Sequence, residues 1–208
     1  MRKVNTEEKL LKIHQAVFQL MERREVSDIS MYDVAKECGM ATSTVYHHYS
    51  NIERLFQHLL QDIFADFDKL LQQSVKKDQI HHWTDINRMI ESTYVDYYNS
   101  HSVARKLILG RHTFSELLHA DSLHDLQMGL QIEKLYRQFF DIPKLNQPIN
   151  IFAISSQVAD KLYTLSCIKY GYITPEMAKE AIYLTESYLL RYIPYICQPV
   201  EHEKLEVS

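Results

Sequence analysis

The sequence is poor in the residues that break regular structure. Only four glycines and five prolines occur among its 208 residues. A fold of many short strands needs frequent turns rich in both residues, so their scarcity favours long helices. No run of about 18 apolar residues is present, which argues against a membrane-spanning helix.

Cysteine is also scarce, and its placement is informative. Cys38, Cys167 and Cys197 lie far apart and form no CxxC pair. This argues against a disulfide framework or a zinc ribbon and is typical of a protein in a reducing, cytoplasmic environment. No apolar segment follows Met1, so we expect no signal peptide.

An excess of basic residues is missing as well. The formal net charge is −4, and residues 1–50 hold seven basic and seven acidic side chains. The excess of acidic residues therefore lies in residues 51–208. If the chain binds nucleic acid, its affinity must come from the local placement of charge rather than from its overall sign.

The first quarter of the chain predicts four helices. Asn5 and Glu8 suggest a capping box at the start of a helix over about 6–23, followed by a loop from Arg23 to Ile29. Ser30 is the expected N-cap of a short helix that ends at Gly39. A third helix covers 42–49. A capping box that begins at Ser50 then opens a long amphipathic helix over 51–71.

The remainder is also predicted to be helical. The polar segment 72–82, with His81 and His82, is expected to be a solvated loop, and 141–148 is the clearest later loop. Gly171 closes one helix, and Thr174 with Pro175 opens the last. The expected helices cover about 83–97, 101–110, 115–140, 149–170 and 175–193. We thus predict an all-α protein of about nine helices without a sheet.

A long helix, a short helix, a glycine turn and a second short helix form the layout of a helix-turn-helix. The major groove is ~12 Å wide and admits one helix, whose polar side chains read base edges. The preceding helix points its N-terminal amides at phosphate. We expect Val45 and Tyr49 on the buried side. The DNA-binding candidates are Thr42, Ser43, Tyr46 and His47 for base edges, Thr44 and His48 for phosphate, and Ser30 in support.

Less specific interpretations of these residues remain open. Tyr46 is alternatively an aromatic residue of the core, and His47 and His48 are alternatively ordinary surface residues. Gly39 is structural under either interpretation, because its turn is needed whatever the helix binds.

The segments Asp33-Val34-Ala35-Lys36-Glu37-Cys38-Gly39-Met40, Thr44-Val45-Tyr46-His47-His48-Tyr49 and Glu53-Arg54-Leu55-Phe56 occur in this order. Together they resemble the DNA-binding signature of the tetracycline-repressor (TetR) family, over about residues 6–60. The resemblance implies a homodimer built on the last two long helices, here about 150–170 and 175–193. It also implies a ligand domain whose occupation shifts the fourth helix and releases the operator.

The sequence departs from the family pattern at three positions. Thr42-Ser43 replaces a frequent Lys-Gly pair, Ile52 stands where a phosphate-binding Lys is common, and Tyr32 stands where an Arg is common. Each missing phosphate contact lowers the salt dependence of binding by roughly one unit. We therefore expect moderate affinity unless other basic residues compensate. The candidates for this are Lys36, Arg54, and Arg2 with Lys3 as a flexible arm.

The C-terminal part is rich in aromatic residues, and the chain has 14 tyrosines. Such residues suit a pocket for an apolar or aromatic effector, although an aromatic side chain at helical spacing is more often part of a core. The ligand-binding candidates are Trp83, Tyr94, Tyr97, Tyr98, Phe114, Met128, Phe139 and Tyr163. His112, His119 and His124 are not spaced as metal ligands, so we expect neither a metal site nor a cofactor.

Three functional hypotheses follow. The first is a ligand-responsive repressor with a DNA-binding domain over 1–50, a ligand-binding and dimerisation domain over 51–208, and a pseudo-palindromic operator. The second keeps the DNA binding but places the C-terminal domain under the control of a partner protein. The third, a helical enzyme, has little support, because no nucleophile elbow, phosphate loop, HExxH motif or cysteine pair is present.

Overall fold

The chain folds into helices throughout the part that the structure describes. The computed structural model describes residues 2–110, 112, 114–145 and 148–200, and of residues 2–5 only the backbone. Within these residues nine α-helices and two short 3-10 turns occur and no extended strand, as the sequence predicts. Their bounds are α1 Arg2–Arg23, η1 Val26–Asp28, α2 Met31–Glu37, α3 Thr42–His48, α4 Ile52–Ser74, η2 Lys77–Gln79, α5 Trp83–Ser100, α6 Ser102–Ile108, α7 Ser115–Phe139, α8 Ile151–Tyr170 and α9 Pro175–Leu189.

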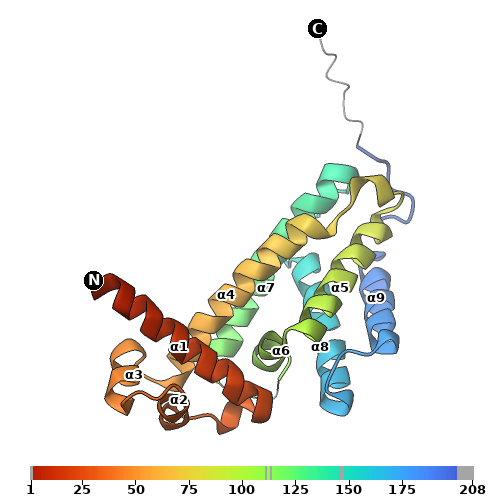
Figure 1. The fold of residues 1–208 in the computed structure, drawn as a ribbon. Coiled ribbons are helices and arrows are strands. Elements are labelled where there is room, and N and C mark those ends of the chain that lie inside the picture. The colour runs from red at the N-terminus through yellow and green to blue at the C-terminus, as the bar shows by residue number, and fades with distance from the viewer. Residues whose placement is uncertain (1, 111, 113, 146–147, 201–208) are drawn as a thin grey trace.

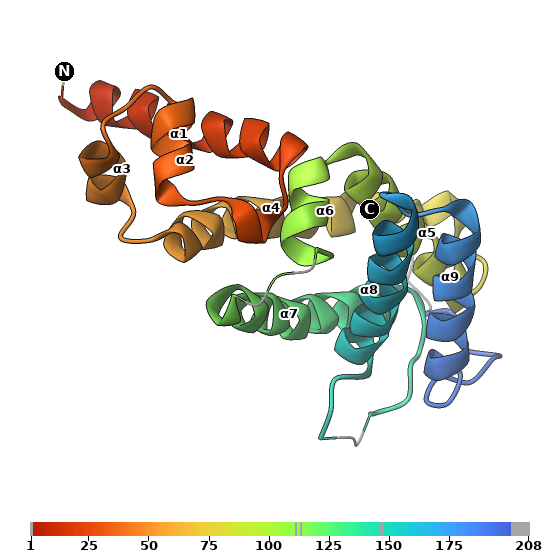
Figure 2. The ribbon, with the colours of Figure 1, turned by 90° about the horizontal axis from the view of Figure 1, so that it is seen from below.

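The helices form two groups joined by α4. Helices α1, α2 and α3 make a small module at one end, and α5, α7, α8 and α9 make a larger bundle (Figure 1). Helix α4 begins in the module and runs along α7 into the bundle, so one rigid element belongs to both groups. Seen from below, α6 lies between the module and the bundle (Figure 2).

Several helix ends form as the sequence predicts. Ser30 and Asp33 make a reciprocal capping box at the start of α2. Gly39 follows α2 with φ of +65°, a conformation that side chains with a Cβ adopt only at a cost, and Gly171 closes α8 with φ of +81°. Thr174 caps α9, with Pro175 in its first turn.

Two expected helix starts are wrong. Helix α1 begins at Arg2, so Asn5 lies inside the helix instead of capping it. No glycine or proline among residues 2–5 interrupts the helix before Thr6, and Arg2 and Lys3 are therefore helical rather than a flexible arm. Helix α4 is capped by Asn51, whose Oδ1 accepts from the Arg54 amide at 2.8 Å, and Ser50 lies one residue outside.

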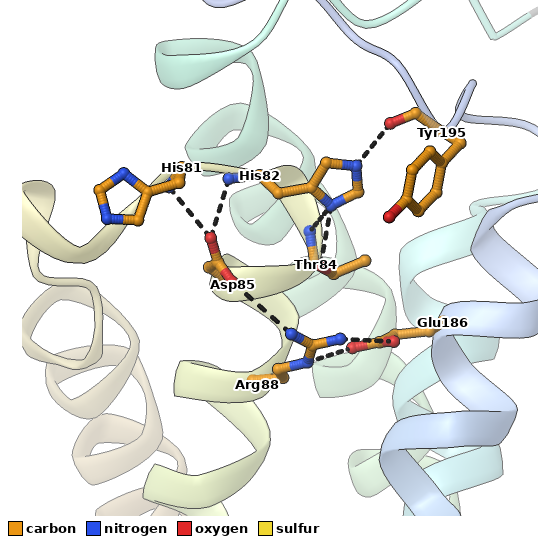
Figure 3. Close-up of polar contacts among 7 residues, drawn as sticks. All are labelled: His81, His82, Thr84, Asp85, Arg88, Glu186 and Tyr195. Carbon is orange, nitrogen blue, oxygen red and sulfur yellow. Dashed lines mark hydrogen bonds and ion pairs between the residues drawn. The ribbon is translucent and has the colours of Figure 1, made fainter.

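The start of α5 corrects the expectation of a solvated loop at His81 and His82. The carboxylate of Asp85 accepts from both of their backbone amides, at 3.0 and 2.8 Å, and the His82 ring contacts the Tyr195 carbonyl at 2.5 Å (Figure 3). One turn further, Arg88 pairs with Glu186 of α9 at 2.8 Å. These contacts fix the start of α5 against α9 and the segment after it.

The end of the described chain adds one short pairing outside the helices. An isolated antiparallel bridge joins Phe140 to Pro199, and the Asp141 amide donates to the Gln198 carbonyl at 2.8 Å. This segment therefore packs back on the end of α7. None of the described helices has the length and apolar character that crossing a membrane requires.

Candidate functional site

Helix α3 is fixed by one buried face, and its other face is free. Val45 is fully buried, and the Tyr49 hydroxyl hydrogen-bonds the His14 ring of α1 at 2.7 Å. The ring of His58, from α4, lies against both of these side chains. Burial, helped by Asp62, raises the pKa of Tyr49 to about 12, so this hydroxyl stays protonated. Both residues that we expected on the buried side therefore lie there.

The predicted DNA-binding residues of α3 share the outer face. Ser43, Tyr46 and His47 are exposed, with 52% of Tyr46 accessible. Thr42, Thr44 and His48 are half-buried at its edges. Burial lowers the pKa of His48, and the neighbouring His47 and Lys9 lower it further, so its ring is neutral at pH 7. A neutral imidazole has one donor and one acceptor nitrogen and suits neutral polar partners as well as phosphate.

Helix α2 brings Ser30 and a further exposed aromatic residue to the same module. The Ser30 hydroxyl oxygen accepts from the Asp33 amide at 3.2 Å and contacts the Asp33 carboxylate at 2.5 Å. Hydrogen bonds to this carboxylate from the Ser30 hydroxyl, from Arg24 and from the Ser30 amide lower the pKa of Asp33 to about 2. Tyr32, next to the cap, is 67% exposed. We did not predict Tyr32 as a DNA-binding candidate, although its position in the first turn of α2 is a signal for that role.

Both described arginines of the module, and Arg54 at the start of α4, are already paired. Arg23 meets Glu37 at 2.8 Å, Arg24 meets Asp33 at 2.9 Å, and Arg54 lies 3.6 Å from Glu116 of α7. Lys36 is exposed on α2, and its side chain makes no ion pair with any residue that the structure describes. Lys36 is therefore the basic group of α2 that remains available for phosphate.

A small cavity of about 40 Å³ lies inside the bundle. This is space for a few water molecules, whereas pockets that bind drug-sized ligands hold ~300–1,000 Å³. Its walls come from α4, α5, α7, α8 and the end of α9. The lining residues are Phe67, Asn87, Ile90, Glu91, Tyr94, Tyr98, Asp121, His124, Asp125, Met128, Ile132, Tyr136, Phe152, Ser155, Ser156, Ala159, Asp160, Tyr163 and Leu189.

Four of the eight predicted ligand-binding residues lie on this wall. They are Tyr94, Tyr98, Met128 and Tyr163, and they come from α5, α7 and α8. The Tyr94 hydroxyl donates to the Met128 sulfur at 3.3 Å. These residues meet because the three helices pack side by side around the cavity.

The other four lie elsewhere, each with its own packing partner. The Trp83 indole donates to the Pro194 carbonyl at 3.1 Å, and the Tyr97 hydroxyl donates to Asp66 at 3.1 Å. The Phe114 ring packs 5.8 Å from Phe56, and Phe139 is half-buried against the core near the end of α7. These four side chains are packed against other parts of the fold, away from the cavity. The spacing of residues along one helix does not show which neighbouring helix a side chain will meet.

The cavity also contains acidic residues that we did not predict. Glu91 of α5, Asp121 and Asp125 of α7, and Asp160 of α8 all line it. Burial raises the pKa of Glu91 to about 7, against a lowering by its hydrogen bond from Tyr163. Burial and then Asp125 raise the pKa of Asp121 to about 7. Burial, followed by the charges of Asp125, Asp121 and Glu91, raises the pKa of Asp160 well above its usual value.

The cavity wall includes contacts between α7 and α4, the helix that joins the two groups. His124 of α7 lines the cavity and stacks on Phe64 of α4, with ring centroids 4.0 Å apart and 7° between planes. The amide of Gln131 donates to Asp68 of α4 at 2.9 Å. A second link joins α6 to the module, where Lys106 donates to the Arg24 carbonyl at 3.0 Å. A change in the cavity can therefore reach α4 through packed side chains.

Residues 13–59 match the family model described as "Bacterial regulatory proteins, tetR family". No curated protein matches the sequence. The matched segment contains α2, α3 and the Gly39 turn, which are the elements of the candidate DNA-binding face.

Solved structures resemble the chain over most of its length. A TetR-family regulator from Streptomyces coelicolor is 15% identical and has a TM-score of 0.67, over 89% of this chain and 99% of that one. The fatty acid degradation regulator FadR from Bacillus halodurans is 16% identical with a TM-score of 0.60, over 87% and 94%. The repressor AlkX from Dietzia is 16% identical with a TM-score of 0.52, over 89% and 98%. Because these sequence identities are low, the comparison shows a shared fold and nothing more.

The family match lies on the helix-turn-helix, and the structural likeness extends through the helices that follow it. Residues 13–59 are thus similar to bacterial regulatory proteins of the tetR family, and the chain shares its fold with solved TetR-family transcriptional regulators.

Proposed function

We propose that the chain is a ligand-responsive repressor that binds a pseudo-palindromic operator as a homodimer and leaves it when a small effector binds. The observation that carries the proposal is the free outer face of α3. Its Tyr46, Ser43 and His47 side chains are exposed, and Val45 and Tyr49 fix the opposite face.

Each exposed residue has a defined role in the proposal. Tyr46, His47, Ser43 and Thr42 contact base edges, because hydroxyl and imidazole groups donate and accept hydrogen bonds in the major groove. Thr44 and His48 contact phosphate from the edges of the helix, and Ser30 supports the phosphate contacts at the start of α2. The Tyr32 hydroxyl and the unpaired Lys36 provide further phosphate contacts from α2.

The dimer in this proposal is built on α8 and α9. Both helices expose large apolar side chains, including Leu165 and Ile168 on α8 and Tyr183 and Leu184 on α9. Pairing two such surfaces around a two-fold axis buries them in a four-helix arrangement. The two copies of α3 must then lie ~34–36 Å apart, or a multiple of that distance, to enter successive major grooves.

Effector binding enlarges the cavity in this proposal. A cavity of about 40 Å³ is too small for a molecule of drug size, so α7 or α4 must move to admit one. Because His124 stacks on Phe64, displacement of α7 changes the tilt of α4 and hence the separation of the two reading helices. The affinity for the operator then falls, because both half-sites are no longer contacted together.

A gel shift with the DNA upstream of the protein's own gene tests the DNA-binding part. We expect a shift at low salt that weakens steeply as salt is raised. Tyr46→Ala should weaken binding by roughly 5- to 150-fold, because one good base contact contributes ~1–3 kcal/mol of discrimination. Tyr195→Ala, at another exposed tyrosine far from α3, is the matched control and should leave the shift intact. Helicity and the mass in solution should be unchanged in both variants.

The dimer is tested separately. Leu184→Glu places a charge on the proposed interface and should convert the dimer to a monomer in light scattering. Ile196→Glu, at a residue exposed beyond α9, should not. A monomeric wild-type protein, or an unchanged dimer in Leu184→Glu, would contradict the assignment of α8 and α9.

One observation supports control by a partner protein as a second candidate. Helix α7 exposes four leucines, Leu118, Leu123, Leu126 and Leu130, each about half accessible. Exposed apolar patches are typical of protein-binding surfaces. Leu126→Lys with Leu130→Lys should leave the response to small molecules unchanged if the effector enters the cavity. If instead these substitutions remove regulation in cells, the partner hypothesis is favoured.

A further inference from the structure

We propose that the effector of this protein is an organic cation with an aromatic or apolar body, held by the carboxylates and rings of the cavity. The proposal rests on the ligand response described above and adds the chemical class of the ligand. It is carried by the charge of the wall, by the lack of basic partners, by one unpaired buried side chain and by the surrounding rings.

The wall is acidic on three sides. Glu91 enters from α5, Asp121 and Asp125 from α7, and Asp160 from α8. Only 6% of the surface of Glu91 is accessible. Burying several carboxyl groups around one space costs free energy, both from lost hydration and from mutual repulsion. A positive charge in the middle offsets both costs.

No basic side chain of the described chain neutralises this cluster. The residues that line the cavity include no lysine and no arginine. The hydrogen bonds that the carboxylates receive come from neutral donors: Tyr163 to Glu91, Tyr98 to Asp160 at 3.4 Å and Gln157 to Asp125 at 3.0 Å. Asp121 receives none from the described residues. The cluster therefore lacks a counterion in the protein itself.

His124 provides an independent sign that the cavity is built for a ligand. It lines the cavity and is 8% exposed, and its Nε2 atom has no hydrogen-bond partner among the described residues. The carboxylate of Asp68 lies 3.9 Å from that atom, which is too far for a hydrogen bond. Burial lowers the pKa of His124. Its neutral ring is thus no counterion, and a buried polar atom without a partner is what a bound ligand can satisfy.

Aromatic rings surround the same space. Phe67 packs edge-on against Tyr94 and Tyr98, with centroids 5.2 and 5.4 Å apart, and Tyr136 packs 5.0 Å from Phe152. All five rings line the cavity. The face of an aromatic ring attracts a cation within about 6 Å, most strongly where water is excluded. Rings and carboxylates together favour a bulky cation over a small hydrated one.

Two other ligand classes fit less well. An anion would meet four carboxylates and no basic group. A metal ion needs three or four ligands converging within about 2.0–2.6 Å of one point. No cluster of His, Cys, Asp or Glu with metal-binding geometry occurs among the described residues. The carboxylates are spread around the wall, as suits an organic ion.

The proposal is tested with charged and uncharged probes of matched shape. Benzyltrimethylammonium is compared with neopentylbenzene, its neutral isostere, and tetraphenylphosphonium with tetraphenylborate, an anion of nearly the same shape. Binding is followed by calorimetry and by the fluorescence of Trp83, the single tryptophan, whose ring lies 6.4 Å from that of Tyr136. We expect at least one cation to bind at least ten-fold more tightly than its matched probe, a difference of about 1.4 kcal/mol.

Neutral substitutions of the carboxylates locate the effect. Glu91→Gln and Asp160→Asn should each weaken cation binding about ten-fold and leave the neutral probe unaffected. If the substitution at the buried Glu91 disturbs folding, Asp121→Asn repeats the test at a more accessible carboxylate. Asp96→Asn, at an exposed carboxylate on the same helix as Glu91, is the matched control and should change nothing.

Proton release provides a second readout. The ionisable groups that line the cavity are Glu91, Tyr94 and Tyr98 of α5, Asp121, His124, Asp125 and Tyr136 of α7, and Asp160 and Tyr163 of α8. The charges of Asp68 of α4 and Glu186 of α9 act on this set from outside the lining. A bound cation favours the ionised carboxylates, so protons leave on binding. The heat of binding near pH 7 should then depend on the ionisation enthalpy of the buffer, and cation affinity should fall as the pH drops towards 5.

The outcomes separate this proposal from the proposed function. The hypothesis of a cationic effector is wrong if no cation binds, or if the matched neutral or anionic probes bind as tightly as the cations. It is also wrong if the carboxylate substitutions leave cation affinity unchanged. None of these results bears on operator binding. If cations bind but no DNA fragment shifts, the repressor is wrong and the cavity assignment stands. A bound cation that also weakens the gel shift supports both.

Discussion

The α1–α3 module and the larger helical bundle place their polar side chains in opposite ways. In the module, the core is apolar around Val45 and Leu55, and Tyr46, Ser43 and His47 face outward. In the bundle, Glu91 and His124 are buried at the cavity. A surface that reads DNA needs exposed donors and acceptors on a rigid support. A cavity that senses a ligand needs polar groups whose cost of burial the ligand relieves.

The largest expected effect concerns the core that the two regions share. Phe56 of α4 is fully buried and packs on Phe114, at the entrance to α7. Phe56→Ala should lower the free energy of unfolding by about 3–5 kcal/mol, because it leaves a cavity in a packed core. Chemical denaturation followed by circular dichroism measures this loss. Separate transitions for the module and the bundle in the wild type would contradict a shared core.

The second effect concerns the buried carboxyl group of the bundle. The pKa of Glu91 is about 7 in the folded protein, above its value in the unfolded chain. The folded protein retains this proton between about pH 4.5 and 7, where the unfolded chain releases it, so stability falls as the pH rises through this window. The loss should be about 3–4 kcal/mol, since one pKa unit corresponds to ~1.4 kcal/mol.

Thermal melts of the wild type and Glu91→Gln between pH 4.5 and 8 measure this effect. The variant should have the flatter profile, and Asp96→Asn should behave as the wild type. Equal slopes for Glu91→Gln and the wild type would show that another group is responsible.

A third, smaller effect compares two glycines, one in each region. A Cβ at Gly129 of α7 would lie 2.6 Å from the Ala153 backbone nitrogen of α8 and 2.8 Å from the Ala153 Cβ. Gly129→Ala should lower stability by about 1–2 kcal/mol, since overpacking outweighs the gain in helix propensity. Gly39→Ala meets open space but keeps a positive φ, so its cost should be about 1 kcal/mol. Urea titrations rank the two, and the reverse order would contradict tight packing of α7 on α8.

The smallest effect is expected at the surface. Arg88 pairs with Glu186 at 2.8 Å, and about half of the arginine side chain is accessible. Arg88→Met should lower the melting temperature only slightly, because exposed ion pairs contribute ~0–1 kcal/mol. A larger loss would mean that the contacts at the start of α5 in Figure 3 act as one unit.

The two regions also differ in how much of them the sequence predicts. Helices, the Ser30 cap and the turn at Gly39 depend on neighbouring residues, so local patterns are enough to predict them. The acidic cavity joins Glu91, Asp121 and Asp160 from three helices, and their meeting depends on how those helices pack. Half of the predicted aromatic lining, such as Trp83 and Phe114, packs elsewhere for the same reason. Asn5 shows that a local pattern can also mislead. Its capping motif predicts a helix start, but the helix already begins at Arg2, so Asn5 lies inside it.

The ring contacts of His58 have a consequence for how the α1–α3 module can be produced as a separate fragment. His58 belongs to α4, yet its ring packs 5.3 Å from His14 of α1 and 5.8 Å from Tyr49, the residue that anchors α3. A fragment that stops at residue 50 lacks this side chain and the buried Leu55 and Leu59 beside it. A minimal recombinant fragment for operator studies should therefore extend through the first turns of α4, to at least residue 60.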